Sequence, residues 1–324
     1  MKKESGAFLN RDFILGIALS TLSFLSIVLI PLIGAMIMFL APLPVLFFYA
    51  KLGRVRGFAV FGISLSLVLL LLNLLNPGIV IPFLFFIFIG GTGMIMAEVL
   101  NRSLSIEKTL IASMIAVLTG FGCLFLIYSY QAGQTPWQLI EHYIVRIIGE
   151  NIKFYEKLDV SSEQIALLKE NASQIADFLT RIFPAAILIM AGMSVWMNIF
   201  LARPLFRWRG LRYPDFGDLT RWHAPEKMIW VLIASGGLLF MPISFVMYSG
   251  LNVLIVCLFI YLCEGISITA FFFKVKKIPV FFKVMFYVLI AIQQYILLFI
   301  IALGLFNLWV DFRKFIRPAQ DENV

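Results

Sequence analysis

Long apolar runs constrain this chain more than any other feature of its sequence. Several of them exceed eighteen residues with few or no charges, which is the length that crosses a bilayer as a helix. Of the 324 residues, 61% are hydrophobic and 14% are charged, whereas a typical soluble domain has about 25% charged residues. The sequence therefore predicts an all-α fold, a polytopic transmembrane helical bundle.

We expect about nine spans, six before a polar connector and three after it. Their expected ranges are 12–30, 33–50, 57–75, 79–98, 108–130, 180–203, 227–247, 251–273 and 283–309. Asn76-Pro77-Gly78 predicts a turn between the third span and the fourth. The expected parts are a six-span unit at 1–203, a basic cytoplasmic connector at 204–226 and a three-span unit at 227–324.

The distribution of Lys and Arg predicts the orientation, because these residues accumulate in cytoplasmic loops. Basic clusters lie near residues 51–56, 102–108, 203–227 and 274–283. In the nine-span arrangement all four share one side with the N-terminus, which is therefore expected in the cytoplasm. Arg313, Lys314 and Arg317 would lie outside. Either the charge rule is broken there, or residues 279–309 do not cross the membrane once.

The polar segment before the sixth span predicts an external amphipathic helical hairpin at residues 136–182. Its first helix, expected at 136–158, opens with Thr135-Pro136, a cap followed by proline at the first helical position. The second begins with Ser161 and Gln164, which have the spacing of a capping box. The hairpin either lies on the outer membrane surface or forms a lid over a cavity.

Glu264 is the clearest carboxylate inside an apolar run, and such a group usually indicates function or pairing. It lies ten residues before Lys274, so it is expected about 15 Å from that end of its helix. Other polar groups are expected in the same layer, and they complete the candidate intramembrane site: Tyr261, Gln293, Gln294 and Ser235. One interpretation is a substrate or proton site with Glu264 as proton carrier or cation partner. The other is a buried glutamate that fixes helix packing.

The basic connector is expected to anchor the protein to anionic headgroups and to bind a cytoplasmic partner. The candidate docking residues are Arg207, Arg209, Arg212, Asp215, Asp218 and His223. The net charge of +8 is explained by such anchoring, so nucleic acid is not an expected partner.

Motifs for catalysis, cofactors and metals are absent from the sequence. There is no P-loop and no H-E-x-x-H, and the two histidines, His142 and His223, are expected on opposite sides of the membrane. We therefore nominate no catalytic residue, no cofactor and no metal site, and an intramembrane enzyme is the least favoured class.

Three stretches resemble the YybS-like family, bacterial multi-pass membrane proteins with a domain of unknown function. They are LTRWHAPEKMIW (219–230), NVLIVCLFIYLCEGISI (252–268) and GLFNLWVDFRK (304–314). The family pattern has an arginine where this chain has His223, and an aspartate where it has Asn307. The resemblance implies a bacterial cytoplasmic (inner) membrane location but no activity.

Residues 12–203, with APLPVLFFYAKLG at 41–53, also resemble the six-helix substrate-binding subunits of energy-coupling-factor transporters. That likeness implies binding of a small metabolite from outside, with separate ATPase and coupling subunits. The sequence thus favours a protein that binds or transports a small molecule or lipid. The alternative is a non-transporting cell-envelope or assembly protein that acts through cytoplasmic or membrane protein partners.

Overall fold

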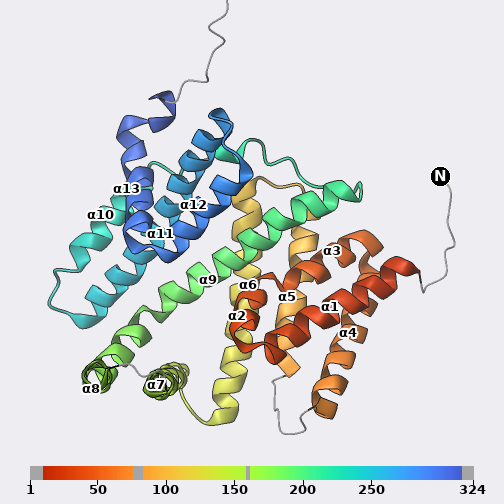
Figure 1. Ribbon diagram of the computed structural model, residues 1–324, viewed down its shortest axis with the longest axis horizontal. Helices are drawn as coiled ribbons and strands as arrows, with labels where there is room; N and C mark the ends of the chain where they lie inside the picture. Colours follow the sequence, from red (N-terminus) through yellow and green to blue (C-terminus); the bar gives the residue numbers. More distant parts are fainter. Residues whose placement is uncertain (1–9, 76–82, 158–160, 316–324) are drawn as a thin grey trace, which may run out of the picture. The chain divides into compact units, whose positions relative to one another are not determined.

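The computed structural model describes residues 10–75, 83–157 and 161–315, and these residues form helices and no strands (Figure 1). The helices are α1 (Arg11–Leu29), α2 (Pro31–Leu40), α3 (Pro42–Leu52), α4 (Arg54–Leu75), α5 (Phe83–Asn101), α6 (Ile106–Ala132), α7 (Pro136–Glu156), α8 (Ser162–Glu170), α9 (Ala172–Trp208), α10 (Met228–Leu238), α11 (Ser244–Val275), α12 (Val280–Ile292) and α13 (Gln294–Val310), with two short 3₁₀ turns, η1 (Leu219–Arg221) and η2 (Phe312–Phe315). The all-α prediction is confirmed for this part of the chain. The turn expected at Asn76-Pro77-Gly78 lies outside it, and so does Arg317.

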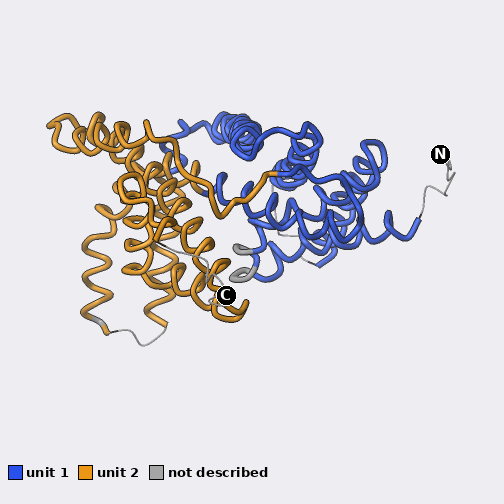
Figure 2. The backbone as a smooth tube through the Cα atoms, turned by 90° about the horizontal axis from the view of Figure 1, so that it is seen from above, with its two compact units in different colours: residues 1–140, 190–215 blue, residues 141–189, 216–324 orange. Residues whose placement is uncertain are grey.

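The chain forms two compact units, coloured separately in Figure 2. Unit 1 consists of Met1–Ile140 and Met190–Asp215, and unit 2 consists of Glu141–Ile189 and Phe216–Val324. The chain passes between the units within α7, within α9 and in the basic connector.

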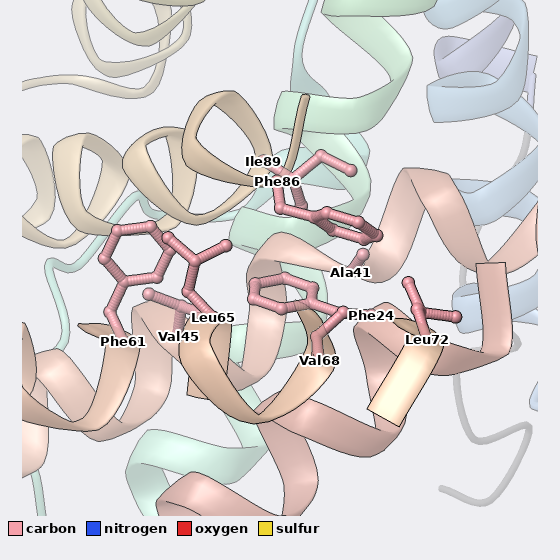
Figure 3. Packing of buried hydrophobic residues seen from close by; sticks show 9 residues of the cluster. All are labelled: Phe24, Ala41, Val45, Phe61, Leu65, Val68, Leu72, Phe86 and Ile89. Carbon is pink, nitrogen blue, oxygen red and sulfur yellow. The ribbon is translucent and has the colours of Figure 1, made fainter. Parts of the chain in front are cut away.

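The core of unit 1 is a cluster of buried apolar side chains from α1, α3, α4 and α5, with Ala41 between α2 and α3 (Figure 3). Its members are Phe24, Ala41, Val45, Phe61, Leu65, Val68, Leu72, Phe86 and Ile89. Phe24 of α1 lies at the centre, with its ring centroid 5.6 Å from that of Phe86 and 6.5 Å from that of Phe61. Aromatic packing of this kind ties α1 to α4 and α5.

Six helices are long and apolar enough to cross a membrane, namely α1, α4, α5, α6, α9 and α11. The pair α12 and α13 passes the same test together but is bent by 103°, so it would be a seventh candidate if it counts as one span. The prediction of a multi-pass helical membrane protein is therefore supported in its general form.

Three of the nine expected spans do not form a single long helix: 283–309 is divided into α12 and α13 at Gln293, and proline explains the other two. The expected span 33–50 is divided into α2 and α3 at Ala41, because Pro42 and Pro44 have no backbone N–H to continue the helix. The expected span 227–247 is divided between α10, which ends at Leu238, four residues before Pro242, and the start of α11 at Ser244. If the helix continued, the ring of Pro242 would clash with the carbonyl group of Leu238, so the helix ends there. The count of nine spans stays a prediction.

The segment expected as an amphipathic hairpin is helical, with different boundaries. The predicted caps are present: Gln138 N donates to Thr135 Oγ1 at 3.3 Å, and Gln164 N donates to Ser161 Oγ at 3.4 Å. The second expected helix is interrupted at Asn171, the C-cap of α8. Its remainder begins α9, which continues for 37 residues to Trp208.

Candidate functional site

Glu264 lies in α11 with only 4% of its surface exposed, and both of its carboxylate oxygens accept hydrogen bonds. Oε1 accepts from the side-chain amide of Asn307 on α13 at 2.9 Å. Oε2 accepts from the backbone N–H of Ala224, in the polar connector, at 3.1 Å. The carboxylate thus joins α11, α13 and the connector within unit 2.

Ser267, one turn further along α11, and Arg313, in η2, hold the backbone of the same connector. Ser267 Oγ lies 3.0 Å from both Leu219 O and Trp222 O and has one hydrogen to donate to these two acceptors. The guanidinium of Arg313 donates to Trp222 O at 2.7 Å and Thr220 O at 3.2 Å, and it lies 3.0 Å from Ser267 Oγ. These bonds go to backbone carbonyl groups, so the side chains in the connector can differ without loss of the attachment.

Lys274 attaches the start of the same segment to the end of α11. Its Nζ lies 2.8 Å from Asp218 Oδ2, and Asp218 Oδ1 accepts from the hydroxyl of Thr220 at 2.7 Å. The hydrogen bond from Lys274, with those from Thr220, lowers the pKa of Asp218 to about 2. Residues 218–224 therefore run along α11 from Lys274 to Glu264 and are held at both ends; this stretch is called the pinned segment below.

Burial of Arg313 lowers its pKa, while the nearby charge of Glu264 acts in the opposite direction. Both groups are bonded to neutral partners: the two oxygens of Glu264 accept hydrogen bonds, and Nε and Nη2 of Arg313 donate them. A buried charge requires this kind of compensation.

Two glycines bring α11 and α13 close enough for these bonds. A Cβ atom on Gly304 would collide with the carbonyl oxygen of Tyr261, and one on Gly265 would collide with the carbonyl oxygen of Ile300. Small residues allow such close helix approach in membrane proteins. The crossing places Asn307 opposite Glu264.

The other residues of the expected intramembrane site lie in different surroundings. Tyr261 is buried, and its backbone carbonyl oxygen lies against Gly304. The hydroxyl of Ser235 donates to Leu232 O at 2.8 Å within α10. Gln293 forms the break between α12 and α13, and both Gln293 and Gln294 are exposed. The structure gives no direct bond from Glu264 to these side chains.

The end of α11 agrees with the sequence prediction, because the helix ends at Val275, one residue after Lys274. Its extra length lies at its start, Ser244, and α11 has 32 residues in all. At 1.5 Å per residue it is about 48 Å long, whereas a hydrocarbon core is about 30 Å thick. The pinned segment covers the last turns of α11, so Glu264 lies against polar chain.

The candidate docking residues are exposed on the connector. Arg207 lies in the last turn of α9, and Arg209 directly follows the helix, with its guanidinium 4.0 Å from the ring centroid of Trp208. Arg212 and Asp215 follow in unit 1, whereas Asp218 and His223 belong to the pinned segment of unit 2. They lie along one stretch of chain that continues from unit 1 into unit 2.

Sequence reasoning did not select Asn307, Ser267 and Arg313 as site residues. The sequence does indicate that Arg313 is unusual, because its charge falls on the non-cytoplasmic side in the nine-span arrangement. Nothing in the sequence indicates a role for the backbone N–H of Ala224. Among the described residues, no three His, Cys, Asp or Glu side chains are grouped to hold a metal ion.

Unit 2 also contains two open cavities between α7, α8 and α9. One, of about 220 Å³, is lined only by apolar residues, namely Ile144, Ile147, Ile148, Leu179, Ile182, Phe183 and Ala186. The other, of about 550 Å³, is lined by Tyr155, Gln164, Leu167, Leu168, Asn171 and Ile175. The same helices thus offer a purely apolar cavity and a mixed one, together called the α7–α9 groove below.

Comparison with known proteins identifies a family for this chain. A family model described as "Predicted membrane protein (DUF2232)" matches residues 18–308, a range that includes Glu264 and Asn307. No curated protein and no solved structure matches the chain. The chain therefore belongs to the DUF2232 family of predicted membrane proteins.

Proposed function

We propose that the protein binds a lipid in the α7–α9 groove. The observation that carries this proposal is the all-apolar lining of the smaller cavity, from Ile144 on α7 to Ala186 on α9. Ligand sites are typically concave and mostly apolar with a few polar groups. The larger cavity supplies such groups in Gln164, Asn171 and Tyr155.

A lipid fits this combination better than a polar metabolite does. An acyl chain takes the apolar cavity, and a headgroup with hydrogen-bonding atoms takes the mixed one. The bilayer supplies lipid at high local concentration, so even a groove that is open to its surroundings can be occupied. Transport of the bound molecule would be a further step, for which the cavity gives no path.

We place the groove on the outer side of a bacterial cytoplasmic membrane, with the N-terminus and connector 204–226 inside. The asymmetry of Lys and Arg supports this orientation. The likeness of residues 12–203 to substrate-binding subunits of energy-coupling-factor transporters agrees with a ligand captured on the outer side. In that case α7 and α8 act as the lid over the bound molecule.

Filling the groove tests the proposal. Ala186→Trp places an indole in the apolar cavity, and Leu188→Trp adds the same ring at an exposed position on α9 outside it. After exchange into mild detergent, native mass spectrometry should find retained lipid on the parent protein and on Leu188→Trp, and several-fold less on Ala186→Trp. Equal retention by all three proteins would contradict a lipid site in the groove.

A second function, docking of a protein partner, rests on the exposed cations of the connector. Arg207, Arg209 and Arg212 are exposed, whereas the neighbouring pinned segment is fixed by its backbone. A surface of this kind suits an acidic partner. Chemical cross-linking in membranes should lose a specific adduct when these three arginines are changed to glutamine and keep it when Lys276 and Lys277 are changed instead; an adduct that survives the arginine changes rules the docking site out.

A further inference from the structure

Helices α12 and α13 are each too short to cross a bilayer. They have 13 and 17 residues, and the chain bends by 103° at Gln293 between them. At 1.5 Å per residue their lengths are about 20 Å and about 25 Å, below the hydrocarbon thickness of about 30 Å. A single straight crossing by this pair is therefore excluded.

Both ends of the pair are attached to the pinned segment. The chain that leads into α12 is held by Lys274, which contacts Asp218 at 2.8 Å. The chain that leaves α13 is held by Arg313, which donates to Trp222 O and Thr220 O. The hydroxyl of Thr220 in turn contacts Asp218 at 2.7 Å. Entry and exit therefore lie at the same edge of unit 2.

We infer that residues 280–310 form a re-entrant hairpin, which enters the bilayer from the side of the pinned segment and returns to that side. The partner of its outer surface is lipid. This inference is independent of the proposed lipid groove, because it rests on α12 and α13 and on the side of the membrane at which they end.

The exposed surface of the hairpin has the composition of a lipid-facing surface. Large apolar side chains are exposed on both helices, among them Phe281, Met285, Ile292, Leu298 and Phe299. They are spread around both helices with no charged rim, whereas a protein-binding surface has an apolar centre and a polar rim. Basic residues and an exposed tryptophan lie only at the ends, namely Lys283, Trp309 and Lys314. Basic residues and tryptophan are typical of helix ends that lie among the lipid headgroups.

At the break, the backbone N–H and the backbone carbonyl group of Gln293 are both hydrogen-bonded within the pair of helices. Its N–H donates to Leu289 O at 2.8 Å, and its carbonyl oxygen accepts from Ile296 N and Leu297 N at 3.1 Å each. A helix break is tolerated at membrane depth when neighbouring groups satisfy the freed backbone. The exposed side chains of Gln293 and Gln294 are then the most deeply placed polar groups of the hairpin.

The inference also removes the conflict in the charge distribution. With a hairpin in place of the ninth expected span, Arg313 and Lys314 return to the side that carries the basic connector. They then obey the positive-inside rule together with the other basic clusters. The C-terminal end of the described chain shares the side of the connector.

Cysteine labelling tests the topology in the full-length protein. The native Cys123, Cys257 and Cys263 are replaced by alanine, and single cysteines are introduced as Lys276→Cys before the hairpin and Lys314→Cys after it. Both replaced lysines are exposed. Met241→Cys, in the turn between α10 and α11, serves as the reference for the opposite side.

A membrane-impermeant maleimide is applied to right-side-out and to inverted vesicles. We expect Lys276→Cys and Lys314→Cys to react in the same vesicle type, and Met241→Cys to react in the other. If Lys314→Cys reacts together with Met241→Cys, the pair crosses the membrane and the inference is wrong. It is also wrong if Lys314→Cys reacts from neither side before denaturation, because the residue would then lie within the bilayer.

Discussion

Asn307 on α13 donates a hydrogen bond of 2.9 Å to Glu264 on α11, and 43 residues of chain separate the two. The other oxygen of Glu264 accepts from the backbone of the pinned segment. A single carboxylate in the second half of α11 therefore holds the connector before α10 and the end of α13 in one arrangement. This favours a structural role for Glu264 in fixing the helices, and four predictions follow from the geometry around it.

Removal of the carboxylate should destabilise unit 2. Glu264→Ala leaves the N–H of Ala224 and the amide of Asn307 without acceptors and leaves Arg313 without its counter-charge. We expect a loss of about 2–4 kcal/mol in the free energy of unfolding, measured as a lower midpoint of thermal unfolding in detergent. Glu226→Ala, which removes an exposed acid from the connector, is the matched control. Equal midpoints for the two variants would show that Glu264 does not hold the fold.

Arg313→Lys should release the pinned segment. The planar guanidinium reaches two carbonyl groups and the hydroxyl of Ser267 at once, and a lysine ammonium on a flexible stem cannot reproduce that fork. We expect trypsin to cleave faster after Arg221, whose side chain is 74% exposed. Lys314→Arg, at a side chain that is 79% exposed, should leave the rate unchanged. A cleavage rate that is the same in all three proteins would argue against the attachment.

Gly304→Ala should force α11 and α13 apart. Its new methyl group would meet the carbonyl oxygen of Tyr261, and backbone atoms cannot rotate away. The expected cost is about 1–3 kcal/mol, with a lower unfolding midpoint. Gly237→Ala makes the same change in α10, where the added carbon meets nothing within 4 Å. That control should be neutral or slightly stabilising, and a similar loss in both variants would contradict the close helix crossing.

The pair of Asp218 and Lys274 should make the pinned segment sensitive to acid. The pKa of Asp218 is lowered from 3.8 to about 2 in the folded protein. Its contribution is therefore fully present above the unfolded value and is lost as the pH falls from about 3.8 towards about 2. The contribution is about 1 kcal/mol or less, because both side chains are partly exposed.

Lys274→Met removes the first cause of the lowered pKa. We expect this variant to be less stable than the parent near pH 5 and to lose less stability as the pH falls from about 3.8 towards about 2, measured as the unfolding midpoint in detergent from pH 5 to pH 2. Lys276→Met, two residues further on, is the control. Identical pH profiles for parent and Lys274→Met would contradict the assigned ion pair.

Local signals in the sequence predict much of this fold. Continuous apolar runs locate α1, α4, α5 and α6, because spanning length depends only on the residues of the run. The caps at Thr135 and Ser161 are equally local, since the bonding side chain and the backbone donor lie three residues apart. Prolines are local signals too, but Pro42 and Pro242 interrupt helices that the hydropathy alone would have continued.

The partners of Glu264 could not be predicted in the same way. Its bond to Asn307 depends on the crossing of two helices at Gly265 and Gly304, and its bond to Ala224 uses a backbone N–H, which no residue type identifies. Its depth in the membrane stays a prediction. The apolar groove depends likewise on the placement of α7 beside α9.

The central claim, a lipid site between α7 and α9, is tested most directly by photolabelling. A phospholipid with a photoreactive acyl chain is added to the purified protein over a range of concentrations, and the adducts are mapped by peptide mass spectrometry. The account predicts saturable labelling of peptides that contain residues 144–148 and 179–186, which is lost in Ala186→Trp and kept in Leu188→Trp. Labelling that never saturates, or that spreads evenly over the exposed apolar helices in parent and Ala186→Trp alike, would contradict it.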